Sequence, residues 1–436
     1  MSMRTLTAPF SSSSSIRLPT REVTKRRSLN PRASSTPIPR KEHVVIVGAG
    51  IAGLATALSL HRLGVRSLVL EQGDSLRTGG TSLTLFKNGW RVLDAIGVGD
   101  ELRDKFLQIQ GLVMRSVDGR ELRSFSFEKE APGQEVRAVE RSLLLETLSS
   151  RLPPNSIAFS SKVQSISRQG TEGTLLEHDD GTQTLAEIVI GCEGIRSPVA
   201  KWMGFSEPKY VGYCALRGLG FYPEGQPFEA KVNYIYGRGI RAGFVPVSQK
   251  KVYWFICFNR PSLGQRTLDT SFLKKQALEL MRSWPPEILD VIRSTPDDVV
   301  VKTPLVDRWL WPGLSPPASA GKAAVVGDAW HPMTPNLGQG ACCALEDSVI
   351  LAGKLAAALK GGESVEAALR AYGRERWARI FTLTARANLV GSLLQWDNPV
   401  ACGVRDSAVI PWLVRLGPFL EHTNFECELM GPVAST

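Results

Sequence analysis

Three glycines and one glutamate near the start of the sequence have the types and the spacing that bind a dinucleotide. Gly48, Gly50 and Gly53 follow the pattern GxGxxG, and Glu71 comes 18 residues after the last of them. In this pattern the first glycine permits a tight turn, the second leaves room for a pyrophosphate, and the third lets a helix pack closely on a strand. A carboxylate at this separation is placed to accept hydrogen bonds from ribose hydroxyls.

The elements around these residues fit the same use. Residues 44–47 form an unbroken apolar run that predicts a buried parallel strand, and apolar residues at helical spacing predict a helix over residues 51–63. Gly64 predicts the end of that helix, and residues 67–70 predict a second strand that leads into Glu71. The helix would present free N–H groups and a positive dipole end to a phosphate. A glycine-rich turn in another α/β protein is the alternative, but it leaves Glu71 unexplained.

A second stretch that could bind a ligand covers residues 323–347. An apolar strand is predicted to end at Gly327 and Asp328, and a loop rich in proline and glycine then opens a helix of small and apolar residues. Asp328 could accept hydrogen bonds from the hydroxyls of a sugar-like chain. A surface turn is a poor explanation of the whole stretch, because it lies between a buried strand and an apolar helix. Elsewhere Arg141 precedes a predicted helix, where it could reach a phosphate or a ribityl chain; a solvated surface arginine is an equal alternative.

Residues 210–260 differ from the segments before them. Apolar and polar residues alternate with a period of two, which predicts an antiparallel sheet. Within it, GRGIRAG at residues 237–243 has no helix after it, so we interpret it as a hairpin connection and not as a second dinucleotide turn. A helical pattern over residues 272–293 is interrupted by Pro285 and Pro286.

Three motifs in the right order give the chain a family resemblance. GAGIAG with Glu71, GCEGIRSPV at residues 191–199 and GDAWHPMTPNLGQG at residues 327–340 together resemble the single-component FAD-dependent monooxygenases of the aromatic hydroxylase type. That family includes salicylate hydroxylase-like and zeaxanthin epoxidase-like enzymes, and the chain looks closest to the plant salicylate hydroxylase-like ones. The resemblance covers nearly all of residues 42–390. The middle motif departs from the family pattern, since Glu193 stands where an aspartate is usual.

The resemblance implies an FAD site and a transient NAD(P)H reductant. The cofactor-binding residues that it implies are Gly48, Ala49, Gly50, Ile51, Ala52, Gly53, Glu71, Gln72, Arg141, Val163, Asp328, Pro335, Gly338, Gln339 and Gly340. Glycines and Glu71 would hold the ADP half, a backbone group at Val163 would meet the adenine, Asp328 would bind the ribityl hydroxyls, and the loop from Pro335 would lie beside the isoalloxazine. No residue is an obvious catalytic base. Candidates to line the substrate pocket are Tyr213, Arg217, Tyr234 and Arg241, each of which is individually better explained as an ordinary sheet residue.

The implied fold is α/β with two lobes. A Rossmann-type FAD-binding domain with a parallel sheet would comprise residues 42–205 and 300–390, an antiparallel substrate-binding sheet residues 206–299, and a C-terminal extension residues 391–436. The implied reaction inserts one atom of O2 into a small aromatic or apolar substrate through a flavin C4a-hydroperoxide. The alternatives are a flavin-dependent reductase or dehydrogenase of the geranylgeranyl reductase type, and a flavin-binding protein without turnover.

Charge is unevenly distributed along the 436 residues. The net charge is +10, of which residues 1–41 contribute +8 and the remainder only about +2, so we expect no nucleic-acid partner. The first 41 residues contain nine serines and a single acid, which predicts an organellar transit peptide. Its serine content favours a plastid, with a mitochondrion as the alternative and a disordered basic tail as the less favoured explanation.

Cysteines, histidines and apolar runs set further limits. The seven cysteines and five histidines show neither a metal-ligand spacing nor a disulfide framework, which favours buried thiols in a reducing compartment. No run of about 18 apolar residues occurs, so we expect no membrane span. The segment VIPWLVRLGPFL at residues 409–420 is apolar enough to touch a bilayer, although packing on the core is favoured.

Overall fold

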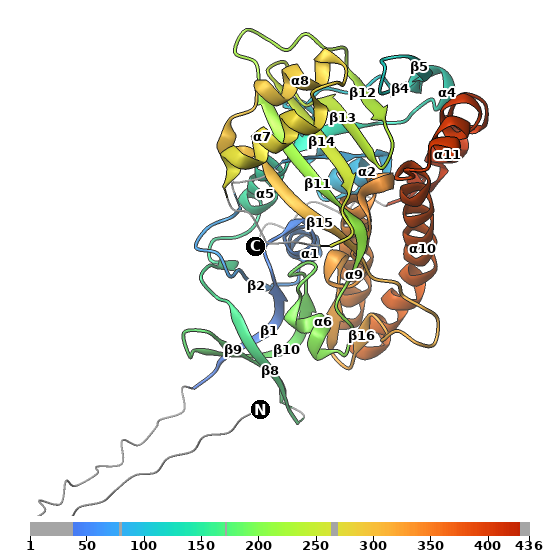
Figure 1. Ribbon diagram of the computed structural model, residues 1–436. Coiled ribbons are helices and arrows are strands. Elements are labelled where there is room, and N and C mark those ends of the chain that lie inside the picture. The colour runs from blue at the N-terminus through green and yellow to red at the C-terminus, as the bar shows by residue number, and fades with distance from the viewer. Residues whose placement is uncertain (1–37, 78–80, 171, 263–268, 428–436) are drawn as a thin grey trace, which may run out of the picture. The chain divides into compact units, whose positions relative to one another are not determined.

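The computed structural model describes residues 38–77, 81–170, 172–262 and 269–427 (Figure 1). Almost all of the predicted transit peptide therefore lies outside the described residues. Within the described part, the strands form one sheet of eight, one of seven and a pair, and helices pack against both large sheets. The predicted α/β class is confirmed.

The eight-stranded sheet contains the predicted dinucleotide-binding strands. Its strands are β16 (Ser319–Ala320), β17 (Ala323–Val325), β10 (Gln183–Gly191), β1 (Arg40–Val47), β2 (Leu68–Leu70) and β7 (Ile157–Ala158) in that order, with β9 (Gly173–His178) on β10 and β8 (Val163–Gln169) on β9. β17, β10, β1, β2 and β7 run parallel. Residues 44–47 are fully buried, because a parallel sheet is covered on both faces, and this explains their unbroken apolar run.

Helices of small residues cover this sheet. α1 (Ile51–Arg62) packs on α9 (Gly340–Leu359), and α10 (Val365–Leu394) lies beside α9 (Figure 1). The first two helices approach closely enough for the Thr56 hydroxyl to donate to the Ser348 hydroxyl at 3.1 Å, and for the Ser348 hydroxyl to donate to the Ala52 carbonyl at 3.1 Å. The small side chains at this contact allow the two helices to approach. The glycine-rich turn before α1 is thereby held next to the loop before α9.

The seven-stranded sheet forms the second layer. Its order is β15 (Val301–Asp307), β11 (Lys209–Phe221), β14 (Lys251–Asn259), β13 (Ile240–Pro246), β12 (Lys231–Tyr236), β4 (Gly111–Ser116) and β5 (Glu121–Ser126). All neighbours are antiparallel except β12 and β4, which run parallel. α7 (Thr270–Met281) and α8 (Pro286–Arg293) cover one face (Figure 1) and pack on Phe244 and Trp254. The predicted antiparallel sheet and the helix break at Pro285 and Pro286 are confirmed. The hairpin connection predicted at 237–243 is confirmed for 237–239, since β13 already begins at Ile240.

The predicted domain boundaries do not coincide with the two sheets. Residues 206–299 supply β11 to β14 only; β4 and β5 come from the segment 42–205, and β15 comes from the segment 300–390. These strands join the sheet by long-range pairing, for example Lys231 with Gly111, and local sequence does not encode such partners. The division into domains and the C-terminal extension at 391–436 otherwise stay predictions.

Shorter elements complete the chain. They are β3 (Ser82–Leu85), β6 (Arg137–Glu140), α2 (Lys87–Ala95), α3 (Gly99–Arg103), α4 (Phe127–Glu130), α5 (Arg141–Ser150), α6 (Pro198–Trp202), η1 (Asp297–Val299), η2 (Gly327–Ala329), η3 (Pro335–Leu337), α11 (Pro399–Val404), η4 (Arg405–Leu413), α12 (Leu416–Leu420) and η5 (Glu421–Thr423). Of the helices in the described ranges, none is both long enough and apolar enough to cross a bilayer. Buried cysteine thiols, as predicted, occur at positions 192, 214, 257, 342, 343 and 402.

Candidate cofactor and substrate site

The turn between β1 and α1 depends on two glycines for close approach. Gly48 has a φ of +101°, and a Cβ there would lie 2.7 Å from the Cys192 carbonyl oxygen. A Cβ on Gly53 would lie 1.9 Å from the Gly48 carbonyl oxygen. Any side chain at either position would therefore collide with backbone, which is why the sequence has glycine where α1 meets the turn.

Gly50 is different, because the space in front of it is open. The nearest atom to a Cβ at this position would be the Cys192 carbonyl oxygen, 4.0 Å away, and Gly50 is the N-cap of α1. The first N–H groups of a helix have no acceptor within it, and the helix dipole is positive there. The protein itself thus leaves room beside Gly50 for an anionic group, with Ile51 and Ala52 in the first helical turn.

Glu71 lies directly after β2 and is almost completely buried. Its Oε2 accepts a hydrogen bond from the backbone N–H of Ala49 at 2.8 Å, and its Oε1 accepts one from Gly73 N–H at 3.0 Å. An ionised carboxylate has about four acceptor sites, so about two remain for ribose hydroxyls. Gln72, the next residue, is exposed.

The segment before β8 runs beside Glu71. The Glu71 N–H donates to the Ala158 carbonyl at 2.8 Å, and the Ser161 N–H donates to the Glu71 carbonyl at 2.8 Å. Val163 is buried and begins β8 two residues later. The structure therefore brings the backbone near Val163 toward the same edge of the sheet as the glycine turn and Glu71.

Asp328 is accessible to solvent although protein surrounds it. It lies in η2 after β17 and is exposed, yet enough protein surrounds it that burial raises the pKa of its carboxyl, against the opposing charges of His331, Arg141 and Arg308. An accessible group surrounded by protein is one that faces a concave site. Gly340 begins α9 beside Asp328, and a Cβ there would lie 3.9 Å from Asp328 Oδ1.

Arg141 begins α5 and also faces this region. Burial lowers the pKa of its guanidinium, Arg77 and Arg217 lower it further, and Asp328 opposes them. The buried Nε of Arg141 has no hydrogen-bond partner among the residues that the structure describes. Three cations and an unpaired N–H beside an accessible carboxylate suit a ligand that carries both phosphate and hydroxyl groups.

The loop before α9 connects both sheets. Pro335 begins η3 and is exposed, while Gly338 has a φ of +64°, and a Cβ there would lie 2.8 Å from the Phe86 ring. Gln339 is fully buried and its Oε1 accepts from Asn88 Nδ2 at 2.8 Å, whereas its Nε2 has no partner in the described part of the chain.

The remaining loop residue, Asn336, reaches the seven-stranded sheet. Its Nδ2 donates to the Tyr213 hydroxyl at 3.0 Å, and its Oδ1 accepts from Arg241. Asn336 was not among the residues predicted from sequence. A polar residue between the motif's proline and glycine residues is the only signal that could have suggested it.

The sheet face toward this loop carries all four predicted pocket residues. Register places Tyr213, Arg217, Tyr234 and Arg241 on the face opposite the helices α7 and α8. Tyr253 and Phe255 share this face but were missed, although the alternation of β14 could have revealed them. Burial raises the pKa of Tyr213 and of Tyr234, and it raises that of Tyr253 to about 12, so these phenols stay neutral at physiological pH.

A buried ionic cluster supports the loop from behind, and sequence reasoning missed it. Arg376 Nε donates to Asp347 Oδ1 at 2.7 Å, and Arg379 Nε donates to Glu346 Oε2 at 2.6 Å, which joins α10 to α9. His331 Nε2 lies 2.5 Å from Asp347 Oδ2. Although burial alone would raise it, His331 and Arg376 lower the pKa of Asp347 to about 2. The acids fall in ACCALED and the arginines some 30 residues later, a pairing that only the packing of the two helices shows.

The middle motif forms a compact turn after β10. Glu193 Oε2 accepts from the Ser197 hydroxyl at 2.6 Å, and Oε1 accepts from Val199 N–H at 3.3 Å. Burial raises the pKa of Glu193 to about 7. The longer side chain of glutamate is therefore accommodated within the turn by its own hydrogen bonds.

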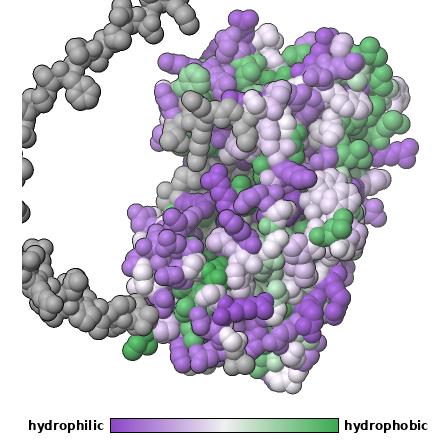
Figure 2. Space-filling view, turned by 60° about the horizontal axis from the view of Figure 1, so that its bottom comes forward, coloured by the Kyte–Doolittle hydropathy of each residue, from purple (hydrophilic) through white to green (hydrophobic). Residues whose placement is uncertain are grey.

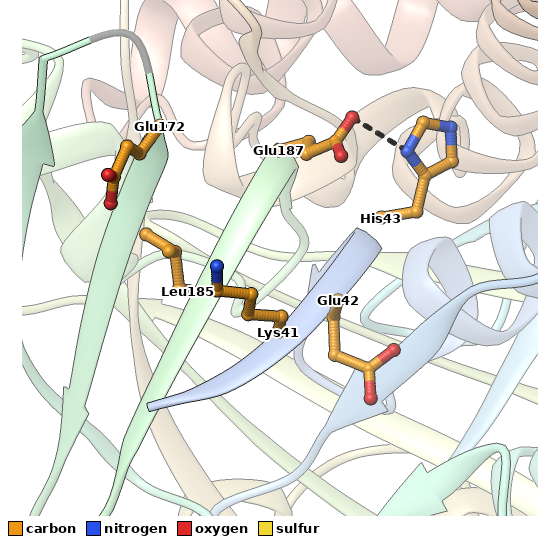
Figure 3. A pocket seen from close by; sticks show the side chains of 6 residues that line it. All are labelled: Lys41, Glu42, His43, Glu172, Leu185 and Glu187. Atoms are coloured by element: carbon orange, nitrogen blue, oxygen red, sulfur yellow. Dashed lines mark hydrogen bonds and ion pairs between the residues drawn. The ribbon is translucent and has the colours of Figure 1, made fainter. Parts of the chain in front are cut away.

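A separate hollow lies at the other end of the parallel sheet. Figure 3 shows it between β1 and β10, where His43 Nδ1 lies 2.9 Å from Glu187 Oε2. Its volume is about 350 Å³, and its lining is Lys41, Glu42, His43, Glu172, Leu185 and Glu187. Ligands of open α/β sheets bind beyond the carboxyl ends of the strands, whereas this hollow is near the amino ends of β1 and β10. It is not the site described above.

Known proteins share both the sequence and this architecture. The model of the FAD binding domain family matches residues 41–387. Monooxygenase 2 of Arabidopsis thaliana is 35% identical over 403 residues, covering 89% of this chain and 98% of that protein. The chloroplastic zeaxanthin epoxidase of an Oncidium hybrid cultivar is 27% identical, covering 82% of this chain and 56% of its own length. The crystal structure of HpxO from Klebsiella pneumoniae, complexed with FAD and uric acid, superposes with a TM-score of 0.74 at 23% identity, covering 85% of this chain and 92% of that one.

Proposed function

The chain belongs to the family of FAD-dependent monooxygenases of the aromatic hydroxylase type, and from that premise we propose that NAD(P)H is its transient reductant and that it inserts one atom of O2 into a small aromatic or apolar substrate. The observation that carries this proposal is the accessible carboxylate of Asp328 in electrostatic reach of Arg141, whose buried Nε has no hydrogen-bond partner among the described residues. That pair supplies an acceptor for hydroxyls and a donor for an anion, which a ribityl phosphate requires.

The residues present suit FAD along the whole length of the cofactor. The open space at Gly50 and the start of α1 would hold the pyrophosphate, and Glu71 would accept from the ribose. Asp328 and Arg141 would hold the ribityl chain, and the loop from Pro335 to Gly340 would lie beside the isoalloxazine. When bound, FAD supplies electron transfer from the nicotinamide and the activation of O2.

The protein's own contribution is to orient the substrate and to exclude water. We place the substrate on the aromatic face that includes Tyr234 and Phe255, beside the point where Asn336 bonds to Tyr213. Neutral phenols can donate hydrogen bonds to a substrate oxygen, and Arg217 and Arg241 would stabilise negative charge on it. The planar ring of uric acid in the HpxO complex supports a planar substrate here.

We also propose a plastid location and peripheral contact with a membrane. The serine-rich basic segment 1–41 and the similarity to a chloroplastic zeaxanthin epoxidase support the plastid, with a mitochondrion as the alternative. Exposed apolar residues near the C-terminus support the membrane contact.

The first experiment measures the fate of electrons and oxygen in the purified full-length chain. The flavoprotein is reduced anaerobically with NADPH or NADH, mixed with ¹⁸O2 and a panel of small aromatic compounds, and the products are analysed by mass spectrometry. We expect flavin bleaching, reoxidation and one ¹⁸O atom in a product. Bleaching with no labelled product for any compound, and with reduction of a compound's double bond, would identify a reductase. Absence of bleaching by either nucleotide would contradict the proposed reductant.

A further inference from the structure

The last helical stretch of the chain has an apolar outer face. α11 continues directly into the π-helical segment η4, and the side chains of Val400, Val404, Trp412 and Leu413 are exposed along it, with Val400 74%, Trp412 76% and Leu413 71% exposed. We call these four residues the C-terminal ridge. A helix that faces water usually carries charged residues on its outer side. Between residues 399 and 413, all of which the structure describes, the charged residues are Arg405 and Asp406, and Arg405 Nε donates to Asp406 Oδ1 at 2.7 Å.

The inner face of the same stretch fixes the C-terminal ridge to the seven-stranded sheet. The buried guanidinium of Arg405 donates to the Gly237 carbonyl at 3.0 Å and lies 5.5 Å from the centre of the Tyr236 ring. Ile410 packs with Tyr236 and Leu122. These contacts make the stretch part of the folded body, so its outer residues are held in solvent by the structure beneath them.

We propose that the C-terminal ridge docks the protein on the surface of a lipid bilayer. This proposal rests on the peripheral membrane contact proposed above and names the residues that make it. The four exposed side chains offer an apolar area on the order of 500 Å², the size of the largest apolar patch on a typical monomeric protein, and such a patch is often functional. A stable dimer buries about 800 Å² on each partner, so the C-terminal ridge alone is too small an interface for a second copy of this chain. A bilayer has no such minimum, because each inserted apolar side chain adds independently to the partition energy.

The composition of the C-terminal ridge and of its flanks suits a lipid interface. Tryptophan is enriched at the boundary between headgroups and acyl chains, and Trp412 lies at the end of the stretch beside Leu413. Two exposed arginines flank it: Arg415 follows in the chain, and Arg238 lies in the turn that Arg405 holds through Gly237. Guanidinium groups at the edge of an apolar face can reach lipid phosphates while the apolar residues insert. Figure 2 shows one face of the molecule, on which hydrophobic side chains lie at several places among hydrophilic ones, with a group of them along its upper right edge.

The test is flotation of the full-length holoenzyme with vesicles of pure phosphatidylcholine. Neutral lipid is used because residues 1–41 carry a charge of +8 and would bind anionic vesicles without the C-terminal ridge. The test variant is Trp412→Ser with Leu413→Ser. The matched control is Phe272→Ser with Leu314→Ser, which removes one aromatic and one aliphatic side chain that are 51% and 85% exposed elsewhere. Bound flavin and circular dichroism establish that both variants are folded.

We expect the wild type and the control to float, and the partition coefficient of the Trp412/Leu413 variant to fall by about tenfold or more. No flotation of the wild type, or equal flotation of all three proteins, would overturn the proposal. A wild-type dimer in sedimentation velocity that this variant dissociates would assign the C-terminal ridge to a second copy and would also overturn it. Flotation is measured without reductant or substrate, so a protein that floats but does not oxidise NADPH supports docking while contradicting the proposed function.

Discussion

The carboxylate of Glu71 and the backbone N–H of Ala49 are joined by a hydrogen bond of 2.8 Å across 22 residues of sequence. The bond ties the end of β2 to the turn that follows β1. Because Glu71 also accepts from Gly73, its orientation is set by the backbone on both sides. The group proposed to bind ribose and the turn proposed to bind pyrophosphate are thus held as one unit before any ligand arrives.

Replacing Glu71 with glutamine tests this relationship. An amide cannot accept from Ala49 and from Gly73 through both of its ends, so one N–H would lose its acceptor and the side chain would turn. Loss of charge-assisted hydrogen bonds at about 1.5–3 kcal/mol predicts a rise of about tenfold to a hundredfold in the Kd for FAD. Fluorescence titration of the apoprotein with FAD measures this Kd. Glu172→Gln, at an exposed position, is the control and should leave the Kd unchanged.

Gly50→Val separates cofactor binding from folding. No protein atom lies closer than 4.0 Å to a Cβ at Gly50, so the variant should fold and yet fill the space proposed for pyrophosphate. We expect purified protein with native circular dichroism and almost no flavin absorbance. Gly353→Val places the same side chain in open space on α9 and should retain flavin. Full flavin occupancy in the Gly50 variant would place the pyrophosphate elsewhere.

Asp328→Ala tests the second half of the cofactor site. The carboxylate of Asp328 is accessible, and within the described structure it accepts no hydrogen bond. Its removal should therefore leave the thermal stability of the apoprotein unchanged. We expect loss of most of the bound flavin, which absorbance after gel filtration measures. Asp298→Ala changes an exposed aspartate on η1 and serves as the comparison. A variant that keeps its flavin would contradict the role proposed for Asp328.

Glu193→Gln should alter the pH dependence of stability in a definite direction. Burial raises the pKa of Glu193 from 4.5 to about 7, so the protonated form is the one that the fold favours. The stability that this group contributes is fully present below about pH 4.5 and is lost as the pH rises through about 7. Glutamine imitates the protonated form. We therefore expect the Tm of the variant, relative to wild type, to rise between about pH 5 and pH 8.

Differential scanning calorimetry across that pH range measures the Glu193 effect. The exposed Glu224→Gln variant provides the baseline, because its carboxyl is solvated in both states. A constant offset between the Glu193 variant and wild type at every pH would show that Glu193 is ionised throughout.

Glu346→Ala should destabilise the fold strongly, because Arg379 loses its acid and the buried Arg376 keeps only Asp347. Arg376 and Arg379 both pair with Glu346, which is fully buried. Breaking a buried ion pair from one side costs about 3–5 kcal/mol in the free energy of unfolding. Glu375→Ala breaks the surface pair with Lys354 in the same pair of helices and should cost less than about 1 kcal/mol. Urea unfolding compares them, and equal losses would refute the structural role of the cluster.

The sequence was sufficient for those parts of the molecule whose contacts are close along the chain. The glycine turn, the helix after it and the strand leading to Glu71 follow from one stretch of about 30 residues, since each element constrains its neighbour. The hairpin after β12 was predictable for the same reason. The position of Asp328 between a strand and a helix was predictable for the same reason, and its role in binding stays a prediction.

What the sequence did not reveal depends on pairing between distant segments. β4 joins β12 in parallel although about 115 residues separate them, and the four strands between residues 206 and 299 gave no sign of a missing neighbour. Likewise Glu346 could be matched with Arg379 only after α9 and α10 had been placed side by side. Asn336 lacked any property that distinguishes it from a surface loop residue until Tyr213 was found 3.0 Å from its Nδ2.

The interleaving of strands has a consequence for synthesis on the ribosome. β10 pairs with β17 near residue 325, and β11 pairs with β15 near residue 301, so each large sheet closes only after most of the chain has been made. Until then the apolar edges of β10 and β11 have no covering strand. A chain cut short before residue 325 would have an open edge on its parallel sheet, where it could pair with strands of other chains.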